Sequence, residues 1–168
     1  MKKTGLILTG LVMVTMAFSQ TKPLDKDISS VDGMVNAFYE IVSGPAGQKR
    51  DWDRDKTLYS PGITFTTVTT VNGSPVINTM THDEFIEGSA SLEQTGFFEK
   101  EIHRVTHTYG SIVQVWSTYE FRMTKDGAVV GRGINGIQLY HDGNRWWIKS
   151  AIWQSESDDV KIPSRYGG

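Results

Sequence analysis

The stretch from Phe97 to Glu156 constrains the fold of this chain most strongly, because it holds four runs in which apolar and polar residues alternate. Short turn sequences separate the runs at Tyr109-Gly110, Asp126-Gly127 and Asp142-Gly143. Asp-Gly between alternating runs is a strong β-hairpin signal, since both residues tolerate the positive φ of a two-residue turn. The stretch therefore predicts a meander of four antiparallel strands.

The turns also predict which residues of neighbouring strands face each other. With two-residue turns, Asn135 lies opposite Thr118 on one side and Ser150 on the other, while His103 lies opposite Trp116. Directly paired residues share a face of a sheet, and side chains alternate between faces along each strand. This register sorts the whole meander into two faces, and we expect one of them to line a cavity.

The predicted inner face is apolar at one end and polar at the other. Its apolar end holds Val105, Trp116, Ile137, Leu139, Trp146 and Ile148, and its polar end holds Glu101, His103, Thr118, Glu120, Arg122, Asn135, Gln154 and Glu156. Glu99 and Ser150 are predicted on the same face. A cone-shaped cavity with a closed apolar tip and a polar mouth requires such a gradient.

The opposite face carries large apolar residues that the helices cannot also cover. Such a face favours a partner sheet, so we expect a homodimer through Tyr119, Phe121, Ile134, Trp147 and Trp153. Two alternatives stay open at this point. The inner and outer faces could be exchanged, and a single β-bulge between two turns would move part of a strand to the other face.

The chain before the meander predicts helices and one hairpin. Ser29 or Ser30 caps a helix that stops at Gly44-Pro45, and a shorter helix covers 51–59. Strands are expected over 63–71 and 75–80 around an Asn72-Gly73 turn, followed by a helix that begins with a Thr81/Glu84 capping box and ends before Gly96. The predicted fold class is α+β, with a strongly curved antiparallel sheet wrapped around the N-terminal helices to form a cone with an internal pocket.

A chain of 168 residues fits one domain, which we expect over 29–157, with a flexible segment over 20–28 and a tail over 158–168. Lys2, Lys3 and an apolar run over 6–18 predict a secretory signal peptide over 1–19, cleaved before Gln20. A short uncleaved anchor is the alternative. The expected location is periplasmic or secreted, without membrane attachment after cleavage.

The amino-acid composition argues against several classes of function. The chain has no cysteine, which excludes disulfides, a thiolate nucleophile and a lipoprotein anchor. Its mildly acidic balance, with no basic stripe, argues against nucleic-acid binding. The four histidines His82, His103, His107 and His141 are too scattered for a zinc site, so we expect no metal and no cofactor.

Several local sequences resemble those of a known superfamily. They are Ser43-Gly44-Pro45-Ala46-Gly47, Arg50-Asp51-Trp52-Asp53-Arg54, Ser117-Thr118-Tyr119-Glu120, Arg132-Gly133-Ile134-Asn135 and Arg145-Trp146-Trp147-Ile148. With the order of the elements, they are similar to the nuclear transport factor 2-like superfamily, which includes ketosteroid isomerase-like and polyketide cyclase-like proteins. The resemblance implies the cone fold and a site inside the cone. It does not choose between enzymes, binding proteins and accessory domains.

On the predicted inner face, His103 is the candidate catalytic base, with Glu101 and Glu120 in support, because an imidazole moves a proton near neutral pH and a carboxylate can orient it. The alternative is a strand histidine without chemistry. Predicted ligand-binding residues are Tyr39, Trp116, Thr118, Arg122, Asn135, Ser150, Gln154 and Glu156. Arg122 either captures a substrate carboxylate or forms a structural ion pair with Glu120.

Three hypotheses for function follow. The first is a secreted protein that binds a small, mainly apolar molecule with a polar end. The second is a lyase or isomerase-type enzyme (a dehydratase, isomerase or cyclase) that uses His103 and a carboxylate, with Asn135 or Tyr39 stabilising an oxyanion. The third is a dimeric structural or interaction module that works through the outer face.

Overall fold

The computed structural model describes residues 22–168, and the predicted signal peptide lies outside them. The elements in chain order are α1 (Asp25–Ile28), α2 (Val31–Val42), α3 (Trp52–Lys56), β1 (Tyr59–Val71), β2 (Ser74–Met80), α4 (His82–Gly88), α5 (Ala90–Thr95), β3 (Phe98–Tyr109), β4 (Ile112–Arg122), β5 (Gly131–His141), β6 (Trp146–Ser155) and the 3-10 turn η1 (Ser164–Tyr166). Within the described residues, no helix is long and apolar enough to cross a membrane.

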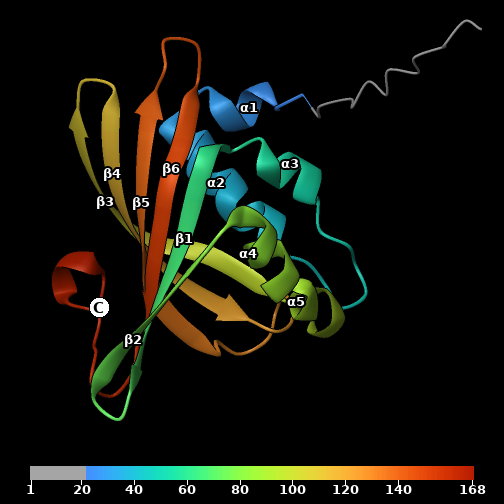
Figure 1. Cartoon of the computed structure of the whole chain (residues 1–168). Coiled ribbons are helices and arrows are strands. Elements are labelled where there is room, and N and C mark those ends of the chain that lie inside the picture. The colour runs from blue at the N-terminus through green and yellow to red at the C-terminus, as the bar shows by residue number, and fades with distance from the viewer. Residues whose placement is uncertain (1–21) are drawn as a thin grey trace, which may run out of the picture.

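The sheet has six strands in the order β2-β1-β6-β5-β4-β3. It curves around α2, and α3, α4 and α5 lie on the same concave side (Figure 1). The pairing of β1 with β6 is parallel, and the other neighbours are antiparallel. The predicted α+β fold, a curved sheet around the N-terminal helices, is confirmed.

The predicted helix after Ser30 is confirmed as α2. The Ser30 side chain accepts a hydrogen bond from the Gly33 backbone at 2.9 Å, as an N-cap serine does. Met34, Val35 and Phe38 recur at helical spacing and are buried against the sheet. Through this stripe, α2 packs against the concave face of the sheet.

The hairpin forms where the sequence predicts it, and the predicted third helix begins as expected but is divided at Ser89 into α4 and α5. Asn72 and Gly73 have φ of 52° and 75°, the left-handed values that a two-residue turn between β1 and β2 requires. The Thr81 hydroxyl accepts from the Glu84 backbone, and the Glu84 carboxylate accepts from the Thr81 backbone, which completes the capping box of α4.

The register of the meander differs from the prediction because the link between β4 and β5 is longer than two residues. Residues 123–130 form this link, and the predicted Asp126-Gly127 turn is only part of it. Ser117, and not Thr118, therefore lies opposite Asn135. A shift of one residue moves every side chain of a strand to the other face. The side chains of Ser117 and Tyr119 face the helices, and those of Trp116 and Thr118 face outward.

Two β-bulges, one in β3 and one in β6, move the side chains that follow them to the opposite face of the sheet. In β3 the extra residue is Ile102, so Glu99 and Glu101 face inward although His103 faces outward with Thr118. In β6 the extra residue is Lys149. Ile148 therefore points inward as predicted, and Ser150 does not.

The apolar tip of the cone is confirmed in part. Ile137, Leu139 and Ile148 are buried against α2, with Trp146 packed at the edge of the same cluster. Trp116, which we expected in this tip, lies on the outer face and is partly exposed. Val105, its partner in the register, shares that face.

The outer face of the sheet is covered in part by the C-terminal segment 158–168. The Thr118 hydroxyl donates to the Tyr166 carbonyl at 2.6 Å, and the Trp116 and Tyr166 rings lie 5.7 Å apart. Arg132 donates to the Gly167 carbonyl at 3.0 Å, and the Ile162 side chain is buried. Thr118 is buried because this segment lies over it.

The residues of the predicted dimer surface do not share one face. Tyr119, Phe121 and Trp153 point to the helices, and Ile134 and Trp147 point outward. The predicted surface was wrong in this respect, because the long β4–β5 link turns Tyr119 and Phe121 inward and the bulge at Lys149 turns Trp153 inward.

Candidate functional site

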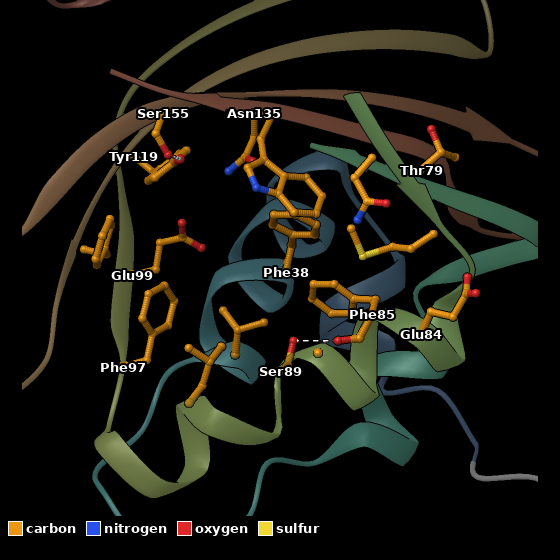
Figure 2. A pocket seen from close by; sticks show the side chains of 17 residues that line it. Phe38, Thr79, Glu84, Phe85, Ser89, Phe97, Glu99, Tyr119, Asn135 and Ser155 are labelled. Atoms are coloured by element: carbon orange, nitrogen blue, oxygen red, sulfur yellow. Dashed lines mark hydrogen bonds between the residues drawn. The ribbon is translucent and has the colours of Figure 1, made fainter. Parts of the chain in front are cut away.

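A cavity of about 590 Å³ lies between the inner face of the sheet and the helices. Figure 2 shows side chains from both layers directed into it. Its lining residues are Phe38, Val42, Asn78, Thr79, Met80, Glu84, Phe85, Gly88, Ser89, Leu92, Phe97, Glu99, Tyr119, Phe121, Asn135, Trp153 and Ser155. The volume falls in the range of small-molecule sites.

The exposed lining residues mark the mouth of the cavity. They come from β2 and α4, and include Asn78, Thr79, Glu84 and Gly88. The deeper wall is mainly aromatic: Phe97 and Phe121 pack with ring centroids 5.4 Å apart, and Phe85 lies 6.3 Å from Trp153. The cavity thus has a polar entrance and an aromatic interior.

Glu99 is the acid in this interior. It lies opposite Phe121 in the β3–β4 register, and Figure 2 shows its carboxyl directed into the cavity between Tyr119 and Phe97. Burial raises the pKa of Glu99 to about 8, and no group among residues 22–168 offsets this by donating a hydrogen bond to the carboxyl. Glu99 is therefore mostly protonated at neutral pH.

The backbone of Glu99 is held by the end of α2. The Ser43 hydroxyl accepts from the Glu99 N–H at 3.0 Å, and its single proton is shared between the Tyr39 carbonyl at 2.8 Å and the Glu99 carbonyl at 3.1 Å. Next to it, Gly44 and Phe97 exchange two backbone hydrogen bonds of 2.7 and 2.9 Å. These four bonds fix the start of β3, so the direction of the Glu99 side chain follows from the fold.

Arg50 in turn fixes the loop that contains Ser43 and Gly44. Its buried guanidinium donates to the backbone carbonyls of Val42, Gly44, Gln48 and Leu92 at 2.6 to 3.1 Å. A planar group with five donors can satisfy four carbonyls at once, which the three donors of a lysine ammonium cannot. Arg50 therefore ties α2, the loop and α5 together beside the cavity.

Behind the cavity wall runs a chain of hydrogen bonds. The Asn135 amide nitrogen donates to the Tyr39 hydroxyl at 2.9 Å, and the Tyr39 and Ser117 hydroxyls lie 2.7 Å apart. Ser117 donates to Glu101, which pairs with Arg104. Burial raises the pKa of Tyr39 well above its usual range, so this hydroxyl stays protonated. The network holds Asn135 in the wall.

The structure does not bring the three predicted catalytic residues together. His103 is exposed on the outer face, next to Gly167 of the C-terminal segment. Glu120 lies on the same outer face and pairs with Arg122 at 2.7 Å and Lys100 at 3.1 Å. Glu101 faces inward, behind the wall. The prediction that they form one site was wrong because of the long β4–β5 link and the bulge at Ile102.

Among the predicted ligand-binding residues, Asn135 lines the cavity and Tyr39 lies directly behind it. The others lie outside the cavity: Trp116, Thr118, Arg122, Ser150, Gln154 and Glu156. Ser150 donates to Gln138 on the outer face at 2.7 Å, and Glu156 accepts from the Ile162 backbone. Arg122 forms the structural ion pair with Glu120 that was one of its two predicted roles.

The sequence predicts Glu99 on the inner face but not as a site residue. The pattern that could have identified it is an acidic residue two positions after Phe97, on the same face of a predicted strand. Tyr119, Phe121 and Trp153 were placed on the wrong face. Within the described residues, no group of three or more histidines or acids could hold a metal ion.

The sequence matches no protein-family model, and a search of curated proteins finds no similar sequence. Solved structures show the fold. A protein of unknown function with a cystatin-like fold from Nostoc punctiforme aligns with a TM-score of 0.58 at 8% identity, over 76% of this chain and 90% of that chain. A nuclear transport factor 2-like protein of unknown function from Silicibacter pomeroyi aligns at 0.50 and 15% identity, over 76% and 94%.

The UBP3-associated protein BRE5 of yeast has the same fold, with a TM-score of 0.53 and 16% identity over 76% of this chain and 94% of that chain. The chain has the nuclear transport factor 2-like cone fold, as its local sequences predict. Identities this low show the fold alone, so the function has to be argued from the cavity.

The raised pKa of Glu99 makes stability depend on pH. Because the folded state holds this proton up to about pH 8, whereas the unfolded chain releases it near 4.5, ionisation costs stability as pH rises through this window. Relative to wild type, Glu99→Gln should gain about 1.4 kcal/mol in free energy of unfolding per pH unit between about 5 and 8. Urea unfolding at several pH values measures this.

Glu120→Gln is the matched control on the outer face. Its ion pairs with Lys100 and Arg122 lower the pKa of Glu120, so its stabilising contribution is present at neutral pH and is lost as pH falls. The two variants should therefore differ from wild type in opposite directions at pH 7. Parallel pH curves for wild type and Glu99→Gln would show that Glu99 is an ordinary solvated acid.

Proposed function

We propose that this chain binds a small, mainly apolar molecule with one polar end inside the cone. The observation that carries the proposal is the aromatic cavity of about 590 Å³ with the Glu99 carboxyl in its interior. The proposal includes export, which rests on the N-terminal sequence pattern. After cell fractionation, the protein should be found outside the cytoplasm and begin near Gln20 by mass spectrometry. Recovery from the cytoplasm alone would contradict export, and an intact N-terminus would contradict cleavage.

The lining supports an apolar body for the ligand. The lining includes five aromatic side chains, Phe38, Phe85, Phe97, Phe121 and Trp153. Removing their ring surface from water stabilises a complex with an apolar ligand. The polar groups are few and come from separate strands, with Glu99 on β3, Tyr119 on β4 and Asn135 on β5. A few convergent polar groups in an apolar cavity are the usual basis of orientation and specificity.

Filling the mouth of the cavity should weaken binding strongly without unfolding the protein. Gly88 lies in α4 at the mouth, and a Cβ there meets no atom within 4 Å. Gly88→Leu should also favour the helix, since leucine is a better helix former than glycine. We expect wild type to bind the neutral fluorescent probe N-phenyl-1-naphthylamine saturably and Gly88→Leu to bind it at least tenfold more weakly.

Ser91→Leu is the control, because Ser91 is exposed on α5 and does not line the cavity. It adds the same side chain nearby and should bind the probe as wild type does. Thermal unfolding followed by circular dichroism checks that both variants fold. Equal probe binding by Gly88→Leu and wild type would place the binding site elsewhere.

A second candidate function is proton transfer, and the raised pKa of Glu99 favours it. A carboxyl that ionises near pH 8 is a stronger base than an ordinary glutamate. The Tyr119 hydroxyl, which lies 3.1 Å from the Ser155 hydroxyl, and the Asn135 amide line the same cavity and can stabilise an oxyanion. The candidate reaction is proton abstraction next to a carbonyl group, with Glu99 in place of the predicted His103.

Deuterium exchange of 2-tetralone in heavy water, followed by NMR, tests this function. Exchange by wild type should rise with pH and level off above about pH 8, because the ionised Glu99 is the base. Glu99→Gln should lose the catalysed exchange, and His103→Ala on the outer face should keep it. Unchanged exchange in Glu99→Gln would exclude Glu99 as the base.

A further inference from the structure

We propose that the polar end of the ligand is a positively charged nitrogen, an amine or ammonium group on an apolar body, which pairs with the Glu99 carboxylate inside the aromatic wall. This inference rests on the proposed binding function and names the chemical class of the ligand.

The charges around the cavity have one sign. Of the described residues that line it, Glu84 and Glu99 are acidic and none is Lys, Arg or His. Glu84 lies at the mouth, where its hydrogen bonds with Thr81 lower the pKa of the carboxyl and keep it ionised. A cation that enters therefore passes one carboxylate and reaches a second, and an anion meets repulsion at both.

The basic residues that are near Glu99 in the chain and in the sheet have other partners. Lys100 and Arg122 pair with Glu120 on the outer face. Arg104 pairs with Glu101 and Asp32. Glu99 is thus an acid without a counter-ion, in a sheet whose other inward-facing acid on β3 has one. A positively charged ligand would supply the missing partner.

The walls next to Glu99 suit a cation. Phe121 lies opposite it in the β3–β4 register, and Phe97, two residues before it in the chain, packs against Phe121. Phe38, Tyr119 and Trp153 line the same space. The faces of aromatic rings attract cations, most strongly where water is excluded. The ring faces offer a neutral oxygen no comparable attraction.

Binding of a cation is coupled to release of a proton. Free Glu99 is mostly protonated at pH 7 and must ionise to form the pair. Of the other groups that face it, Tyr119 and Tyr39 stay protonated, because burial raises the pKa of Tyr119 to about 12 and that of Tyr39 well above its usual range. Glu101 is paired with Arg104, and Glu84 lies at the mouth.

Three probes with the same phenylbutyl body separate the ligand classes: 4-phenylbutylamine, 4-phenylbutanol and 4-phenylbutyrate. Isothermal titration calorimetry of the full chain at pH 7 should give at least tenfold tighter binding of the amine than of the alcohol, and weaker binding of the carboxylate. Titrations in two buffers of different ionisation enthalpy should show release of about 0.9 proton with the amine, as expected for a group with pKa near 8.

Glu99→Gln should bind the amine and the alcohol equally, without proton release, while Glu120→Gln should behave as wild type. A measurement on wild type alone gives the same test: affinity for the amine should rise about tenfold from pH 7 to pH 9 as Glu99 ionises. Equal affinity of wild type for amine and alcohol, a preference for the amine retained in Glu99→Gln, or a flat pH dependence would overturn the inference.

The outcome for N-phenyl-1-naphthylamine keeps the two proposals distinguishable. If wild type binds this neutral probe in the cavity and shows no preference for the amine, the cone is a binding site and the ligand is not a cation. If wild type binds neither the neutral probe nor any phenylbutyl compound, the proposed binding function itself is wrong.

Discussion

The hydrogen bonds between the Ser43 hydroxyl and the backbone of Glu99 join the end of α2 to the start of β3, and the character of the cavity depends on this junction. The Gly44–Phe97 bridge strengthens it, and the buried Arg50 guanidinium holds the loop from which Ser43 and Gly44 come. With the backbone fixed on both sides, the Glu99 side chain points into the cone. The sheet and the helices thus enclose an apolar space and place an acid inside it.

An unpaired carboxylate inside an apolar cavity lowers the stability of the fold. Ionised Glu99 costs on the order of 5 kcal/mol, given a pKa near 8 in place of 4.5. Small domains are stable by only about 5–15 kcal/mol, so this is a large fraction of the total. Keeping the proton avoids only part of this cost at pH 7, because the unfolded chain releases the proton near pH 4.5 and each further pH unit costs the folded state about 1.4 kcal/mol. A ligand that brings a positive charge would offset the cost. The same property underlies both the binding and the proton-transfer candidates.

The sequence predicts those parts of the fold that local chemistry decides. The Ser30 cap, the Asn72-Gly73 turn and the Thr81/Glu84 capping box each need a few adjacent residues of a definite type, and all three form. The cone fold follows from the order of these elements and from the resemblance of the local sequences. The similarity to solved structures confirms it.

The site was harder to predict because one residue of register decides which face a side chain takes. The β4–β5 link over 123–130 contains an Asp-Gly pair that resembles a complete turn, and the bulges at Ile102 and Lys149 leave no clear mark in the sequence. Asn135 and the apolar residues of β5 were therefore placed correctly, and His103 was not. The long link turns the inward-predicted residues of β4 and β3 outward, and the bulge at Ile102 turns the first part of β3 back, so Glu99 faces inward as predicted.

The most direct measurement is a carboxyl-carbon NMR titration of the ligand-free protein, with the Glu99 signal assigned by its absence in Glu99→Gln. Burial in the aromatic cavity predicts a titration midpoint near pH 8 for this signal. A midpoint near 4.5 would mean that the Glu99 carboxyl is solvated, and the account of the cavity as an apolar space around an unpaired acid would be wrong.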